Sequence, residues 1–140
     1  MSETQTHPDP SVRPVVLAAG SPSGIPLARD AARAFARSLD PAPSPKAEET
    51  LALVASELAT NALRHGGGRF TSELSADADA VHVAVSDPVP APPRECTPDL
   101  NGGTGGFGWP MVRRLTQGVR ITHGPGPGKT IHVRLARRGS

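Results

Sequence analysis

The sequence predicts an α+β fold, a two-layer sandwich in which helices cover one face of a mixed, mostly antiparallel sheet. Three observations support this prediction. Helical and strand-like segments are interspersed, the strand-like segments mostly occur as neighbouring pairs, and 36% of the 140 residues are hydrophobic, which suits a single core. A chain of this size buries most of its apolar surface on folding without disulfides or a structural metal.

The first half of the chain predicts one strand followed by two helices. Residues 12–18 are apolar and rich in valine, which favours a strand. Apolar residues then recur four apart, which predicts an amphipathic helix over about residues 26–39. Ser44 is a favourable N-cap and Pro45 suits the first helical position, so a second helix begins there and ends at Gly66.

The second half predicts two pairs of strands, separated by a long loop and one short helix. The loop, residues 87–105, contains five prolines and three glycines and has no periodicity. A segment of this length without secondary structure is typical of a functional loop or lid. We expect the strands at residues 69–75, 80–86, 119–122 and 129–135, and the helix at residues 110–116.

These elements make one domain over residues 12–137, preceded by a disordered leader over residues 1–11 that is rich in serine, threonine and proline. The start of the chain lacks the apolar core of a signal peptide, and no apolar run approaches the roughly 20 residues that span a bilayer. Cys96 is the single cysteine, which excludes an intrachain disulfide. We therefore expect a cytoplasmic protein without a membrane partner.

The charges are unevenly distributed along the chain. Residues 101–140 carry seven lysines and arginines and no aspartate or glutamate. A basic half can attract phosphate, nucleic acid or an acidic protein, although solvated surface charge explains the same pattern. Aromatic residues make up 3% of the chain and tyrosine is absent, which argues against a binder of single-stranded nucleic acid. We expect no nucleic-acid partner.

The second helix carries the most informative polar residues. Glu57, Asn61 and His65 are each four residues apart, which places them along one helix face. A carboxylate and a carboxamide on a mostly apolar helix need partners if they point inward, and magnesium and phosphate would supply them. Glu57 could then accept a proton from an attacking hydroxyl or water. An exposed polar stripe is the alternative interpretation.

Residues 57–66, Glu57 to Gly66, closely resemble the N box of the ATPase domain that gyrase and sensor histidine kinases share. They look most similar to the small branch that contains the bacterial anti-sigma-factor serine kinases. The resemblance implies that Asn61 holds Mg²⁺ and contributes to the ATP site. It also implies that Glu57 is the general base.

The expected strand over residues 80–86 is followed by Asp87, and this arrangement resembles a second motif of the same family. In that family the aspartate accepts a hydrogen bond from the amino group of adenine, so the resemblance assigns this role to Asp87. The family usually has a glycine two residues further on, where this chain has Val89.

A glycine-rich segment, residues 102–108, precedes the short helix. Such a segment offers free backbone N–H groups and the positive end of a helix dipole to phosphate. Gly106 and Gly108 fit the family's second glycine motif. The resemblance therefore assigns both residues to the ATP site.

The last expected strand opens with Gly128, Lys129 and Thr130. In relatives a Gly-x-Thr at this place borders the adenine pocket, so the resemblance assigns Gly128 and Thr130 to ATP binding. A P-loop is excluded because it would need a glycine where His123 stands and a helix, rather than a strand, after Thr130.

The resemblance covers residues 12–136 and implies a protein serine/threonine kinase of the anti-sigma type. Such a protein uses Mg-ATP, phosphorylates a small antagonist protein and sequesters a sigma factor, and the resemblance also allows a homodimer. The alternative is a non-catalytic module that binds ATP and holds a regulator. The sequence leaves open whether the chain is an enzyme.

Overall fold

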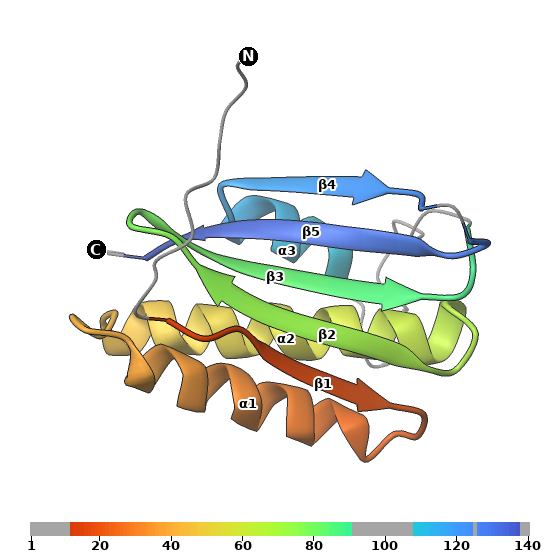
Figure 1. Cartoon of the computed structure of the whole chain (residues 1–140), viewed down its shortest axis with the longest axis horizontal. Coiled ribbons are helices and arrows are strands. Elements are labelled where there is room, and N and C mark those ends of the chain that lie inside the picture. The colour runs from red at the N-terminus through yellow and green to blue at the C-terminus, as the bar shows by residue number, and fades with distance from the viewer. Residues whose placement is uncertain (1–11, 91–107, 125, 138–140) are drawn as a thin grey trace.

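Five strands and three helices form the described part of the chain, which is residues 12–90, 108–124 and 126–137 of a computed structural model (Figure 1). All the elements that the sequence predicts within these ranges are present. Their bounds are β1 Val15–Ala19, α1 Gly24–Ser38, α2 Pro45–His65, β2 Phe70–Ala76, β3 Ala80–Asp87, α3 Gly108–Leu115, β4 Gly118–Thr122 and β5 Lys129–Ala136.

The strands form one sheet in the order β1-β2-β3-β5-β4, and the three helices cover one face of it (Figure 1). This arrangement confirms the expected two-layer α+β fold. The sequence predicted a mixed, mostly antiparallel sheet, and each neighbouring pair of described strands is antiparallel. Strand β4, which follows α3, runs parallel to β3. The two strands do not pair, because β5 lies between them.

The core lies between the sheet and the helices. Alternate residues of the two central strands point towards the helices, including Val83 and Val85 of β3 and Ile131 and Val133 of β5, and all four are at most 1% exposed. The period of two in strands explains why valine and isoleucine alternate with polar residues here. The buried stripe of α2, which includes Leu58, packs on this apolar face.

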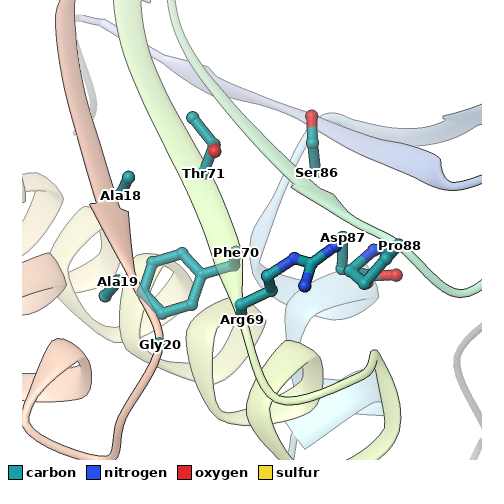
Figure 2. Close-up of a pocket in the computed structure, with 9 residues that line it drawn as sticks. All are labelled: Ala18, Ala19, Gly20, Arg69, Phe70, Thr71, Ser86, Asp87 and Pro88. Carbon is teal, nitrogen blue, oxygen red and sulfur yellow. The ribbon is translucent and has the colours of Figure 1, made fainter.

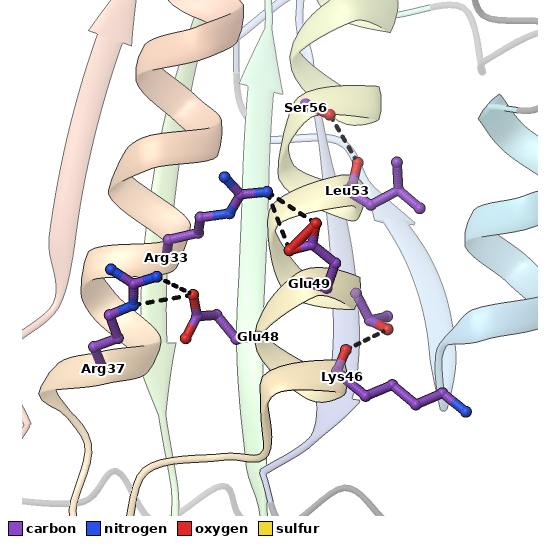
Figure 3. A network of polar contacts seen from close by, with 8 residues as sticks. Arg33, Arg37, Lys46, Glu48, Glu49, Leu53 and Ser56 are labelled. Carbon is purple, nitrogen blue, oxygen red and sulfur yellow. Dashed lines mark hydrogen bonds and ion pairs between the residues drawn. The ribbon is translucent and has the colours of Figure 1, made fainter.

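Helices α1 and α2 pack against each other over alanine-rich faces, and exposed ion pairs connect them (Figure 3). Arg33 donates to both carboxylate oxygens of Glu49, at 3.1 and 3.0 Å. Arg37 lies 2.8 Å from Glu48. Exposed pairs of this kind contribute little to stability, so apolar packing holds the two helices together.

The start of each of the first two helices shows how local sequence sets the boundaries. Ser44 caps α2 as predicted, because its Oγ accepts a hydrogen bond from the backbone N–H of Ala47 at 3.1 Å. Helix α1 begins at Gly24, about two residues earlier than the apolar periodicity indicates. None of the helices within the described ranges combines the length and the apolarity that a membrane span requires.

A polar cluster closes the end of the sheet where β2 turns into β3. The carboxylate of Asp77 accepts hydrogen bonds from the backbone N–H groups of Asp79 and Ala80, at 2.7 and 2.8 Å, and contacts His82 Nε2 at 2.8 Å. The buried Arg137 donates to the backbone oxygen of Asp77 at 2.9 Å. Burial alone would raise the pKa of Asp77. The His82 contact and the hydrogen bonds from the turn amides outweigh this effect, so the pKa lies below its usual value.

Candidate functional site

Helix α2 presents the first candidate residues. Glu57 and Asn61 are both half-buried, and His65 is exposed at the end of the helix. Burial raises the pKa of the Glu57 carboxyl above its usual value, although the positive charges of Arg64 and Arg29 oppose this shift. A carboxylate with a raised pKa is a better proton acceptor near neutral pH.

Asp87 is the last residue of β3 and lies on the face of the sheet that the helices cover. Its side chain is 0% exposed. Its two oxygens have different surroundings. Oδ1 accepts hydrogen bonds from Lys129 Nζ and from the backbone N–H of Val89, both at 2.9 Å. Oδ2 is buried and has no hydrogen-bond partner.

The side-chain nitrogen of Asn61, Nδ2, is also buried without a hydrogen-bond partner. Within the described residues, Asn61 Nδ2 and Asp87 Oδ2 are the buried side-chain polar atoms that lack one. Each such atom costs about 1–3 kcal/mol, which a bound polar ligand can recover. Both atoms belong to residues that the sequence assigns to the ATP site.

The chemistry of these atoms fits the expected ligands. An ionised carboxylate oxygen suits the amino group of adenine, which donates a hydrogen bond. The nitrogen and oxygen of an asparagine amide can exchange places by a flip, so Asn61 can offer an oxygen to a hard cation. Within the described ranges, no group of three or more His, Cys, Asp and Glu side chains could hold a metal. A magnesium ion that takes most of its ligands from phosphate and water needs no such group.

Two glycines allow the chain to approach Asp87 closely. A Cβ atom at Gly128 would overlap the backbone oxygen of Asp87, which lies on the neighbouring strand. A Cβ atom at Gly66 would lie 2.5 Å from Asp87 Oδ2. The sequence assigned Gly66 to the end of α2 alone, and the structure gives it a second role in making room for the carboxylate.

Thr130 lies on the opposite face of the sheet from Asp87, and its assignment to ATP binding stays a prediction. Its hydroxyl contacts Ser86 Oγ at 2.8 Å on the outer face of the sheet, while Asp87 lies on the face that the helices cover. Lys129 lies directly opposite Asp87 in the β3–β5 register and shares its face. Because side chains alternate along a strand, a shift of one residue exchanges the two faces.

A pocket of about 500 Å³ opens at the ends of β1, β2 and β3 (Figure 2). Arg69 extends towards Asp87 and Pro88 in this pocket (Figure 2). Glu57 and Asn61 of α2 do not line this pocket. Its lining residues are Ala18, Ala19, Gly20, Arg69, Phe70, Thr71, Ser86, Asp87 and Pro88.

The second glycine motif lies largely outside the described residues. Gly106 belongs to residues 91–107, and Cys96 lies in the same range. Gly108 is the first residue of α3, so the predicted order of a glycine followed by a helix holds at this point. The assignment of Gly106 and Gly108 to phosphate binding stays a prediction.

A model of the histidine kinase-like ATPase domain family matches residues 19–135. The match spans most of the chain and covers every described strand and helix except β1, of which it includes only Ala19, and the last residue of β5. The chain belongs to this family. Membership implies that the domain binds ATP and supports a regulatory function. A search of curated proteins finds no match.

Proposed function

We propose that this chain is a protein serine/threonine kinase of the anti-sigma type, which uses Mg-ATP to phosphorylate a small antagonist protein. The observation that carries the proposal is that the unpartnered buried atoms, Asn61 Nδ2 and Asp87 Oδ2, belong to the residues expected to meet magnesium and adenine. We further propose that the protein is cytoplasmic, acts on a sigma factor and can form a homodimer.

Each site residue has a distinct task in this proposal. Asp87 Oδ2 accepts the hydrogen bond of the adenine amino group, and Gly128 lets β5 run close beside it. Asn61 holds the magnesium ion, which neutralises phosphate charge when it is bound. Gly106 and Gly108 offer backbone N–H groups to the phosphates.

The transfer step uses Glu57 as the general base. The serine hydroxyl oxygen forms a bond to the γ-phosphorus, the bond from that phosphorus to the β,γ-bridging oxygen breaks, and ADP leaves. The hydroxyl proton passes to the Glu57 carboxylate. The raised pKa of Glu57 suits this task, because a base whose pKa lies nearer to neutral holds the proton better while remaining ionised.

A non-catalytic ATP-binding module is the second candidate, and one observation favours it. Lys129 already pairs with Asp87 inside the domain, at 2.9 Å, so the charge of this carboxylate is balanced without a nucleotide. A module that only binds a regulator transfers no phosphate, so it would not need Glu57 as a proton acceptor.

The two candidates are separated by a phosphate-transfer assay on an antagonist protein identified by co-purification. The kinase proposal expects wild-type protein to transfer phosphate and Glu57→Gln to lose about 10²–10⁴-fold in rate, with ATP affinity within a few fold. Glu73→Gln, on an exposed position of β2, is the matched control and should keep the wild-type rate. Wild-type protein that binds Mg-ATP and the antagonist but transfers no phosphate contradicts the kinase proposal.

A further inference from the structure

Lys129 is a buried lysine that has no role in the proposed phosphate transfer. The chain has two lysines, and the other, Lys46, is exposed in the first turn of α2. Lys129 begins β5 with 1% of its side chain exposed, and it faces the helix layer directly opposite Asp87. A buried ammonium group is costly unless it is paired and hydrogen-bonded.

Two acceptors satisfy this ammonium group. Nζ donates to Asp87 Oδ1 and to the backbone oxygen of Val89, both at 2.9 Å. The Val89 N–H in turn donates to the same Asp87 Oδ1. Three residues thus form a closed network that fixes the aspartate and the first residues after β3.

The network uses only one oxygen of the carboxylate. Oδ1 receives two donors, while Oδ2 receives none although it is buried. A lysine whose purpose was to neutralise a structural carboxylate would gain by contact with both oxygens. The observed asymmetry balances the charge of Asp87 and leaves one acceptor for a donor from outside the chain.

We propose that Lys129 is a positioning residue for base recognition: its hydrogen bond to Oδ1 holds the Asp87 carboxylate turned so that Oδ2 meets the amino group of adenine. This inference rests on the proposed binding of adenine at Asp87. Without the Nζ donor, only the Val89 N–H holds Oδ1, so the carboxylate can turn and Oδ2 is no longer fixed towards the base.

Other charged groups near Asp87 are more exposed than Lys129. Arg69, at the start of β2, lines the same pocket and is exposed. The last turn of α2 brings Gly66 against Oδ2, and the preceding Arg64 and His65 are exposed. Solvent screens exposed charges strongly, so Lys129 supplies most of the counter-charge.

The test compares ATP with purine riboside triphosphate, which lacks the amino group, by calorimetry. Wild-type protein should prefer ATP about tenfold or more, since one hydrogen bond to a charged group is involved. Lys46→Met, the matched control, should keep this preference.

Lys129→Met should lose most of the preference for ATP while binding purine riboside triphosphate as wild type does. Lys129→Gln lacks the ammonium group and should lower the preference in the same way if the methionine variant does not fold. A purely structural role would weaken both nucleotides together and leave the ratio of the two dissociation constants unchanged.

Two results overturn the inference while leaving adenine binding in place. The first is a preference for ATP in Lys129→Met or Lys129→Gln that equals that of wild type. The second is tighter binding of ATP by either variant. Wild-type protein that binds neither nucleotide at millimolar concentration contradicts the proposed function itself.

Discussion

Replacing Asp87 by asparagine tests the candidate adenine site with the smallest change in shape. In the folded protein, Lys129 Nζ and the Val89 N–H both donate to Oδ1. These two donors will hold the amide oxygen of the new asparagine in the place of Oδ1. The amide nitrogen must therefore take the place of Oδ2, where it presents a donor to the donor of adenine.

The expected loss in affinity follows from this reversal. It removes one hydrogen bond to a charged acceptor and leaves two donors facing each other, which we expect to weaken ATP binding at least tenfold, or about 1.4 kcal/mol. Calorimetry with ATP and with purine riboside triphosphate measures the effect. The loss should be confined to ATP, because the second nucleotide offers no amino group to Asp87.

A double variant separates loss of binding from loss of folding. Asp87→Asn alone leaves Lys129 as an unpaired buried charge, and breaking a buried pair costs about 3–5 kcal/mol. Combining it with Lys129→Met removes both charges and should recover much of that stability in thermal unfolding. The double variant should still bind ATP poorly. An Asp87→Asn protein that folds and binds ATP as tightly as wild type refutes the assignment of Asp87 to the base.

Three further predictions concern the reaction and the fold. Because the Glu57 pKa is raised, phosphate transfer should already decline at a pH above the ordinary glutamate pKa, and a rate that stays constant from about pH 8 down to that ordinary value contradicts a general base there. Asp77→Ala should lower the free energy of unfolding by about 1–3 kcal/mol at pH 7 in urea titrations. The pKa of Asp77 is lower in the folded state than in the unfolded state. Its contribution to the free energy of unfolding is therefore complete above the unfolded-state pKa and is lost as the pH falls through the folded-state pKa. The difference in stability between Asp77→Ala and wild type should accordingly shrink below about pH 4. Gly128→Ala should destabilise the domain by about 1–3 kcal/mol because its Cβ meets the Asp87 backbone, whereas Gly118→Ala, with nothing within 4 Å, should be nearly neutral; equal stabilities would contradict the close approach.

The fold was predictable because its local signals agree with one another. The Ser44 cap, the glycines after α2 and the alternation along β3 each mark a boundary or a face without tertiary information. The order of the last two strands was not predictable in the same way. Which of β4 and β5 lies next to β3 depends on how the final hairpin packs on the helices, and no local pattern specifies this.

The candidate site was predictable in part. Glu57, Asn61 and Asp87 could be named as candidates from the sequence, whereas Lys129 was not named. A signal for Lys129 was present, because it lies two residues before the buried Ile131 and so continues the inward-facing set of β5. The asymmetry of the Asp87 oxygens could not be foreseen, since it depends on contacts between three separate segments.

The two carboxylates at opposite ends of β3 show how a structural aspartate differs from a functional one. Asp77 is buried, and its carboxylate oxygens both have partners, with turn amides on Oδ1 and His82 on Oδ2. Asp87 is equally buried, but Oδ2 has no partner. An isolated domain gains nothing from leaving that acceptor empty, because an unmade buried hydrogen bond costs free energy. A ligand that supplies the missing donor would explain this cost. Replacing Asp77 should therefore lower stability alone, whereas replacing Asp87 should lower ATP affinity as well.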